Sequence, residues 1–380
     1  MKEARVGMKS SWPRVEPAPQ QPERLPIGWD KPWLAPLAGY SDLPFRTLCR
    51  EEGAACCVTE MVSAKGLWYD GLNTWKVLET VPWDTPLVVQ LFGAEADCLG
   101  WAVRRLREKG FAWFDLNMGC SVPKVARQGA GSAMLRDPDN ALACARAMIA
   151  AALPGHVSFK LRLGGSRDAV NWLDLALRLE DAGAGLVTLH PRTAQEGFGG
   201  RAHWEAIAEA KRRLGIPVLA SGDLFTAEDG VRCLKETGAD GVMYARGALT
   251  RPSVFREHQA LLGGEPAGES PAGELRRLIR RHMELIGSFG SEDNALYRLR
   301  SIVPRYVRSI PGVRLLRQRL CACQSLGELD GILDAFLAGS LAGAGGACGQ
   351  GGSARLDKFD PPLPSCGDSS LPDREHEPWK

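Results

Sequence analysis

The sequence lacks the features that would indicate a membrane protein, a metalloprotein or a disulfide-stabilised protein. No apolar run reaches the roughly 18 residues that a membrane span needs. The eleven cysteines are an odd number at irregular spacing without a CxxC pair, so neither a zinc site nor a disulfide framework is indicated. The first 26 residues are polar and proline-rich and lack the apolar core of a secretory signal. We therefore expect a cytoplasmic protein with reduced thiols, no metal and no membrane association.

Strong net charge is also missing. The formal net charge is +2, so the chain as a whole indicates no polyanionic or polycationic partner. No G-x-G-x-x-G follows the first apolar segment, which argues against a dinucleotide-binding Rossmann sheet. Hydrophobic residues make up 44% and charged residues 24%, the usual composition of a chain that buries a core.

The sequence does contain an alternation of short apolar segments and amphipathic segments. The predicted strands are Trp33–Ala38, Cys56–Met61, Leu87–Phe92, Trp113–Asn117, Val157–Leu161, Leu186–His190, Pro217–Ser221 and Gly241–Ala245. Helical periodicity between them covers Cys98–Lys109, Asn140–Ala151, Asn171–Ala182, His203–Arg213 and Ala227–Thr237. Eight such units within residues 30–262 predict a closed (β/α)8 TIM barrel better than an open sheet.

Polar or glycine-containing stretches stand at the end of each predicted strand, where the active site of such a barrel lies. They are Pro36-Leu37-Ala38-Gly39, Thr59-Glu60, Gln90, Asn117 with Cys120, Lys160 with Arg162, His190 with Arg192, Ser221-Gly222-Asp223 and Ala245-Arg246-Gly247. Any one of them could be a structural polar group inside the barrel. All eight together indicate a site.

Two of these strand ends suggest chemistry. Cys120 follows an apolar strand, with an amide before it and a basic residue after it, although a buried structural cysteine also fits this pattern. Lys160 inside an apolar strand needs an anion or an acceptor. The small residues and Arg246 after the last two strands suit a phosphate. FMN would use both features, but a phosphorylated sugar would also fit.

The chain changes character after the barrel. Residues 263–273 read as a linker, and helices are predicted over Glu274–Phe289, Glu292–Ile310, Gly312–Ala322 and Ser325–Phe336. Between Glu274 and Leu320 there are eleven arginines, no lysine and four carboxylates. This excess of positive charge predicts a surface for a phosphate backbone, with a solvated helical face as the alternative. Residues 1–29 and 337–380 are predicted to be a disordered arm and a disordered tail.

Together these stretches resemble the tRNA-dihydrouridine synthase family, in its bacterial, FMN-dependent form, over roughly residues 30–336. The motifs that carry the resemblance are Ala35-Pro36-Leu37-Ala38-Gly39-Tyr40-Ser41-Asp42, Val89-Gln90-Leu91, Leu116-Asn117-Met118-Gly119-Cys120, Phe159-Lys160-Leu161-Arg162, His190-Pro191-Arg192-Thr193, Ser221-Gly222-Asp223 and Ala245-Arg246-Gly247. Their order and spacing match as well. The Asn-Met-Gly-Cys motif is highly specific, whereas the glycine motifs alone would be weak.

The resemblance implies an oxidoreductase with tightly bound FMN that is reduced by NADPH or NADH. Hydride would pass from flavin N5 to C6 of a uridine in tRNA, and Cys120 would protonate C5. The implied cofactor contacts are Pro36, Leu37, Ala38, Gln90, Lys160, His190, Ser221, Gly222, Asp223, Ala245 and Arg246. The implied tRNA contacts are Asn117, Lys124, Arg127 and Arg192 in the barrel, and Arg300, Arg314 and Arg317 in the helical domain at 274–336.

The chain departs from the family pattern at four positions. Ser121 stands where the family usually has proline, and Ser221 replaces the usual asparagine. Ala245 and Leu37 replace a common glycine and methionine. None of these changes removes a reacting group, so activity is expected.

Two other functions stay open. One is an FMN barrel acting on a free pyrimidine, such as a dihydroorotate dehydrogenase, which would have no use for arginine-rich helices. The other is a tRNA-binding protein without catalysis, against which the complete set of Gln90, Cys120, Lys160 and His190 argues.

Overall fold

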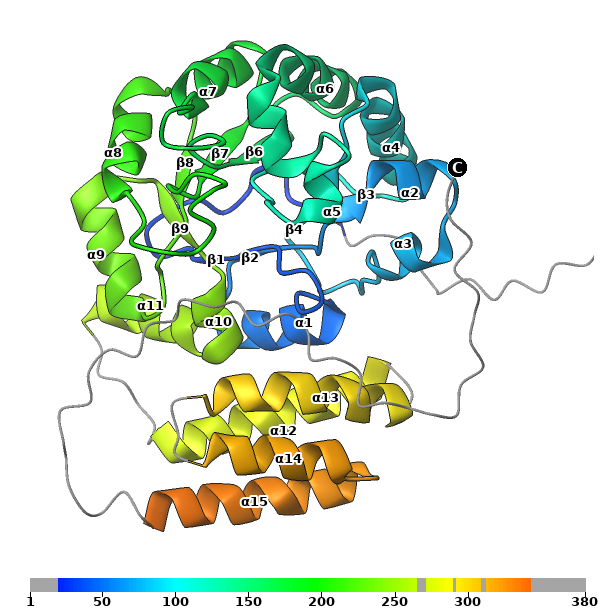
Figure 1. Cartoon of the computed structure of the whole chain (residues 1–380), viewed down its shortest axis with the longest axis vertical. Coiled ribbons are helices and arrows are strands. Elements are labelled where there is room, and N and C mark those ends of the chain that lie inside the picture. Colours follow the sequence, from blue (N-terminus) through cyan, green and yellow to red (C-terminus); the bar gives the residue numbers. More distant parts are fainter. Residues whose placement is uncertain (1–19, 265–270, 290–291, 309–311, 343–380) are drawn as a thin grey trace, which may run out of the picture. The chain divides into compact units, whose positions relative to one another are not determined.

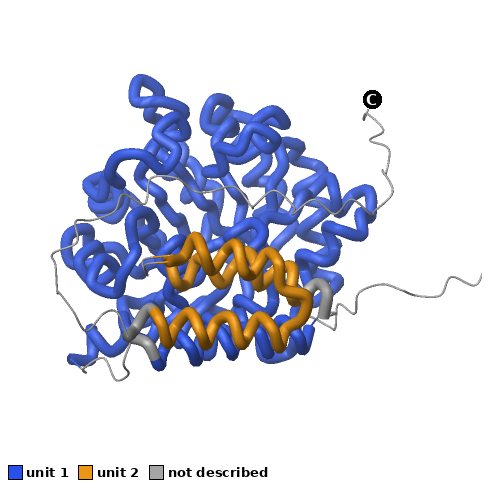
Figure 2. Tube along the Cα trace, turned by 60° about the horizontal axis from the view of Figure 1, so that its bottom comes forward, with its two compact units in different colours: residues 1–289 blue, residues 290–380 orange. Residues whose placement is uncertain are grey.

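The computed structural model describes residues 20–264, 271–289, 292–308 and 312–342 (Figure 1). The chain divides into two compact units, Met1–Phe289 and Gly290–Lys380 (Figure 2). Among the described residues, no helix has the length and apolar character needed to cross a membrane.

The first unit is built on a closed barrel of eight parallel strands (Figure 1). They are β1 Trp33–Leu34, β2 Cys56–Val58, β4 Leu87–Phe92, β5 Trp113–Met118, β6 Val157–Leu161, β7 Leu186–Leu189, β8 Val218–Ala220 and β9 Gly241–Tyr244. β1 pairs with both β2 and β9, and β2 pairs with β4, which closes the ring. A short extra strand, β3 Val62–Ser63, pairs with the end of β4. The predicted TIM barrel is confirmed.

Helices cover the outside of the barrel, as the amphipathic segments predict. They are α1 Leu43–Glu51, α4 Ala96–Glu108, α6 Pro138–Ala151, α7 Trp172–Asp181, α8 Trp204–Arg213, α9 Ala227–Thr237 and α11 Val254–Gly263. Shorter helical pieces follow the carboxyl ends of strands: α2 Ala64–Trp68, α3 Leu72–Lys76, α5 Pro123–Ala126, the 3-10 helix η1 Gly131–Arg136 and α10 Arg246–Thr250. The strand ends therefore lead into short, varied elements that can shape a site.

Local sequence explains where these helices begin and end. α9 starts with a capping box, in which the Thr226 hydroxyl accepts from the Asp229 N–H and the Asp229 carboxylate accepts from the Thr226 N–H. It ends at Gly238, whose φ of 69° lies in the left-handed region that glycine enters without strain.

Residues 20–29, assigned from sequence to a disordered arm, lie against the amino end of the barrel. Leu25 is buried in the core cluster with Trp33 and Trp113. The indole N–H groups of Trp33 and Trp113 donate to the carbonyls of Pro26 and Pro22 at 2.8 and 2.9 Å. Because a buried indole N–H needs an acceptor, these two bonds fix the segment in place. Residues 1–19 lie outside the described residues.

The helices after the barrel belong to both units. α12 Pro271–Phe289 is part of the first unit and packs on α1, where Arg277 and Arg281 form ion pairs with Glu52 and Glu51. The boundary between the two units thus falls after Phe289, whereas the predicted tRNA-binding domain starts at residue 274. That domain assignment stays a prediction.

The second unit consists of α13 Glu292–Tyr306, α14 Val313–Ala322 and α15 Leu326–Ala342. The three helices contact one another, and Leu299, Val303, Leu316, Leu320 and Leu333 on them are buried. Residues 337–342, placed in the predicted tail, are part of α15, and residues 343–380 lie outside the described residues.

Candidate active site

The pairing of the strands brings the predicted polar residues together at the carboxyl end of the barrel. Gln90 on β4 lies opposite Asp115 on β5, and Asn117 on β5 lies opposite Lys160 on β6. His190 directly follows β7. Four residues chosen from sequence therefore meet in one region.

The loop at residues 119–122, here called the Cys120 loop, is fixed by hydrogen bonds from several elements. Asn117 Oδ1 accepts from the backbone N–H groups of Gly119 and Cys120, at 3.1 and 2.9 Å. Arg162 Nε donates to the Gly119 carbonyl at 2.8 Å, and the Ser132 N–H donates to the Cys120 carbonyl at 2.9 Å. The backbone that carries the thiol is thus held in one position.

The Cys120 thiol is partly buried. Burial raises the pKa of the thiol, and the nearby Arg162 and Lys160 only partly oppose this effect. The group is therefore a protonated thiol at neutral pH. Such a thiol can give up a proton, as a general acid must.

Behind the Cys120 loop lies a buried chain of polar side chains. Asn117 Nδ2 donates to Gln90 Oε1 at 2.8 Å, and Gln90 Nε2 donates to Asp115 Oδ2 at 2.7 Å. Ser158 Oγ donates to Asp115 Oδ1 at 2.7 Å. Asp115 was missed in the sequence analysis, although it interrupts the apolar run Trp113–Met118 just as Lys160 interrupts its own strand.

Lys160 and His190 lie in a cationic environment. Burial and the neighbouring Arg162 lower the pKa of Lys160 to about 8. Burial, together with the positive charges of Arg162, Lys160, Arg192 and Arg246, lowers the pKa of His190 well below its usual range. His190 is therefore a neutral imidazole at physiological pH, and an anion placed here would be stabilised.

The opposite side of the mouth, following β7, β8 and β9, is held by ion pairs and is here called the arginine side. The buried Arg192 donates to both oxygens of Asp223 at 2.8 and 2.7 Å. Asp223 also accepts from Arg246 at 3.1 Å and from the Ala202 N–H at 2.7 Å. Asp223, predicted as a cofactor contact, thus fixes two arginines.

An aromatic ring completes the arginine side. Phe198 stacks on His190 with a centroid distance of 5.9 Å. The guanidinium groups of Arg246 and Arg162 lie 4.7 and 5.3 Å from the Phe198 ring centre. Phe198 was not predicted, because no strand end or motif marks it.

Backbone donors are also available here. Among the described residues, the N–H groups of Gly222, Gly247 and Ala248 have no hydrogen-bond partner. Gly222 has φ +105°, and a Cβ there would lie 2.8 Å from the His190 ring, so only glycine fits. With Arg246, these donors suit a phosphate group.

The remaining predicted residues follow β1, β5, β8 and β9. Pro36, Leu37 and Ala38 follow β1, where the Leu37 N–H donates to Ser41 Oγ at 2.9 Å. Ser221 and Ala245 follow β8 and β9. Lys124 and Arg127 are exposed just after the Cys120 loop.

The predicted tRNA contacts differ in exposure. Arg192 is 1% exposed and its guanidinium is occupied by protein groups. In the second unit, Arg314 is exposed, Arg317 is partly buried, and Arg300 donates to the Cys323 carbonyl. The assignment of all these residues to tRNA stays a prediction.

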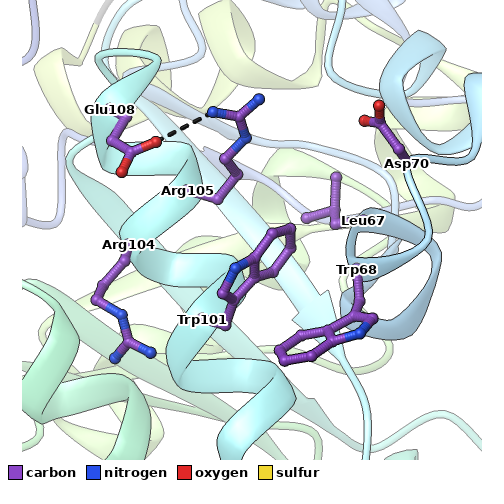
Figure 3. Close-up of a pocket in the computed structure, with 7 residues that line it drawn as sticks. All are labelled: Leu67, Trp68, Asp70, Trp101, Arg104, Arg105 and Glu108. Carbon is purple, nitrogen blue, oxygen red and sulfur yellow. Dashed lines mark hydrogen bonds and ion pairs between the residues drawn. The ribbon is translucent and has the colours of Figure 1, made fainter.

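A separate cavity of about 440 Å³ lies between α2 and α4 (Figure 3). The ring centroids of Trp68 and Trp101 lie 5.1 Å apart there. The Arg105 guanidinium forms an ion pair with the Glu108 carboxylate at 3.1 Å. No residue of the predicted site lines it.

Comparisons with known proteins identify relatives of the chain. A family model described as dihydrouridine synthase matches residues 33–338. The probable tRNA-dihydrouridine synthase 1 of Synechocystis sp. is 37% identical over 303 residues, which cover 79% of this chain and 84% of that protein. The tRNA-dihydrouridine synthase B of Pseudomonas syringae pv. tomato is 35% identical over 286 residues, covering 75% and 84%. The probable tRNA-dihydrouridine synthase of Mycobacterium tuberculosis is 34% identical over 359 residues, covering 90% and 91%.

Among solved structures, morphinone reductase is similar at 13% identity with a TM-score of 0.47, covering 68% of this chain and 92% of that chain. The assignment of the barrel rests on the strand pairing of this chain itself.

Proposed function

The chain belongs to the dihydrouridine synthase family, and we propose that it reduces uridines of tRNA to 5,6-dihydrouridine, with FMN as cofactor and NADPH or NADH as reductant. One observation carries the proposal: a protonated thiol, Cys120, is held rigidly at the mouth of a barrel whose other strand ends provide cationic groups and free backbone donors. This combination provides a proton donor beside a site for an anionic cofactor.

The residues at the mouth fit FMN. Arg246 and the N–H groups of Gly222, Gly247 and Ala248 would bind its phosphate, and the positive charge of Lys160 would favour the reduced ring. When bound, FMN supplies the hydride that adds to C6 of the uracil ring. Gln90 and His190 are two further side chains proposed to contact the cofactor.

Cys120 supplies the proton that C5 needs once C6 has accepted a hydride. The S–H bond breaks, a C5–H bond forms, and the C5–C6 double bond becomes a single bond. The resulting thiolate lies near the positive charges of Arg162 and Lys160, which stabilise it until solvent returns the proton. Asn117 holds the loop in place during this transfer.

The proposed RNA contacts follow from exposure. Lys124 and Arg127 lie on the surface directly after the Cys120 loop, where they can meet phosphates next to the target nucleotide. A uridine must leave its stack to reach the mouth of a barrel. Arg314 and Arg317 on α14 would contact another part of the tRNA.

The catalytic proposal is tested with purified protein. It should be yellow with bound FMN, and it should form dihydrouridine in tRNA lacking this modification when NADPH is added. Reduction of free uridine or of orotate at a comparable kcat/KM would instead support the free-pyrimidine alternative. Flavin-free protein that cannot be reconstituted, yet binds tRNA, would support a non-catalytic function.

The RNA proposal is tested by salt dependence. Replacing Arg314 and Arg317 by alanine should weaken tRNA binding and lower the slope of log Kd against log salt concentration by about one for each phosphate that the variant no longer binds. Arg212→Ala is a matched control, because Arg212 is an exposed arginine on α8 of the barrel. Equal slopes in all three proteins would contradict the assignment.

A further inference from the structure

Asp115 is a buried carboxylate to which the proposed reaction assigns no step. It is 4% exposed, inside the barrel, on the strand that leads to Cys120. Both of its oxygens accept short hydrogen bonds, from Gln90 and from Ser158, each 2.7 Å long. Burial raises its pKa in spite of these bonds. A neutral residue would be easier to bury, so the carboxylate needs an explanation.

The explanation lies in the direction of the hydrogen bonds. An ionised carboxylate can only accept, so Gln90 must turn its NH2 group toward Asp115. Its carbonyl oxygen then faces Asn117, which must in turn offer its own NH2 group. Asn117 Oδ1 is thereby directed at the N–H groups of Gly119 and Cys120. The negative charge of Asp115 at one end of the chain and the two backbone N–H donors at the other end require the same orientation of both amides.

We propose that Asp115 is a positioning residue that fixes the Cys120 loop by dictating the orientation of the Gln90 and Asn117 amides. The inference rests on the proposed function, because it assumes that Cys120 must be held for proton transfer. If both amides were reversed, the Asn117 NH2 group would face the N–H groups of Gly119 and Cys120. The two hydrogen bonds that these N–H groups donate to Asn117 would then be lost.

The decisive variant is Asp115→Asn, which keeps the shape of the side chain. An asparagine can donate as well as accept, so the orientation of Gln90 is then constrained only from the loop, through Asn117. We expect kcat to fall by about 10- to 100-fold, the effect that loss of a residue orienting a metal ligand has in metal sites. FMN content and the KM for tRNA should stay within about twofold. Above pH 6 the variant should be at least as stable as the wild type, because it buries no charge.

Ser158→Ala is the matched control. It removes the other hydrogen bond to Asp115 but leaves the bond between Asp115 and Gln90 intact. Its kcat should therefore stay within about threefold of wild type. A double variant adds a further check: in an Asn117→Ala background, Asp115→Asn should have no additional effect, because both changes act through the same amide.

A readout without turnover separates this inference from the proposed function. The rate at which iodoacetamide alkylates Cys120, followed by mass spectrometry of its peptide, should rise several-fold in Asp115→Asn and not in Ser158→Ala. Unchanged alkylation and unchanged kcat would overturn the positioning inference while the enzyme remained active. If wild-type protein formed no dihydrouridine, the proposed function would fail, and the alkylation comparison would still decide whether Asp115 positions the loop.

Discussion

The two sides of the barrel mouth hold their side chains by different means. The Cys120 side is a chain of amides, Asn117 and Gln90, ending at a single carboxylate. The arginine side is a cluster in which Asp223 binds Arg192 and Arg246. The first fixes the orientation of its side chains, because each hydrogen bond determines whether the next amide presents its NH2 group or its carbonyl oxygen. The second fixes charge, because it keeps guanidinium groups ready for an anion.

This difference matches the two tasks in the proposed reaction. Proton transfer depends on the exact placement of one thiol, and directional hydrogen bonds provide placement. Phosphate binding depends on positive charge and tolerates small displacements. The Cys120 side should therefore be sensitive to isosteric changes, and the arginine side to changes of charge.

The largest effect is expected from Cys120→Ala on the first side. Dihydrouridine formation should fall by at least about 100-fold, since a positioned general acid contributes that much or more. Bound FMN, measured by its absorbance, should remain, because the arginine side is unchanged. Cys233→Ala is a suitable control, since Cys233 lies in the second half of α9, away from the carboxyl ends of the strands. Full activity in Cys120→Ala would remove the thiol from the reaction.

Asp223→Ala should produce the largest loss of stability on the second side. It leaves the buried Arg192 without its carboxylate, a change that typically costs about 3–5 kcal/mol. Urea unfolding would measure the loss. Asp174→Ala removes an exposed partner of Arg178 and should change the free energy of unfolding by less than about 1 kcal/mol. Equal losses of unfolding free energy in both variants would show that the ion pairs of Asp223 stabilise the fold no more than an exposed ion pair does.

The pH dependence of kcat should distinguish the amide chain from the charged cluster. Asp115 has a pKa of about 6, so below that pH its protonated form can donate and no longer dictates the orientation of Gln90. The groups facing it are Gln90 from β4 and Ser158 and Lys160 from β6, and of these Lys160 alone is charged. Activity should therefore decline as the pH falls through about 6, and this decline should be absent in Asp115→Asn. If wild type and Asp115→Asn showed the same decline of kcat at low pH, the decline would be due to another titrating group.

The smallest effect is expected from Phe198→Leu. Leucine keeps an apolar side chain against the cluster but loses the ring beneath Arg246 and Arg162. Each cation–π contact is worth about 0.5–1 kcal/mol at exposed sites and more when it is buried, as at Arg162, so stability should fall by about 1–2 kcal/mol and FMN affinity by only a few-fold. Titration of apoprotein with FMN would measure the change, and loss of all flavin binding would mean that Phe198 contacts the cofactor itself.

The sequence predicted the barrel and several of the residues at its mouth, because strand periodicity and polar strand ends are local patterns. Gln90, Asn117, Lys160 and His190 were found in this way. Asp115 was not, since its importance depends on the pairing of β4 with β5, which a single strand does not reveal.

Other features depended on contacts between distant parts of the chain. Arg192 follows a strand end like the other candidates, but it is buried because Asp223 lies across from it. Residues 20–29 have the composition of a disordered segment, yet two indole N–H groups from β1 and β5 bind their carbonyls. Neither contact can be read from a local pattern.

The packing of α12 on α1 shows that some arginines of the arginine-rich stretch form ion pairs with the barrel unit. Arg277 and Arg281 are neutralised by Glu52 and Glu51, and Glu52 is almost fully buried. These arginines secure the barrel. Under the proposed function, the arginines that would bind RNA, such as Arg314, lie after Phe289, in the unit that does not contain the barrel. A chain that ended at residue 289 would contain the whole of the first unit, whereas one that ended at residue 273 would lack Arg277 and leave the buried Glu52 with its longer ion pair, to Arg256 at 3.5 Å.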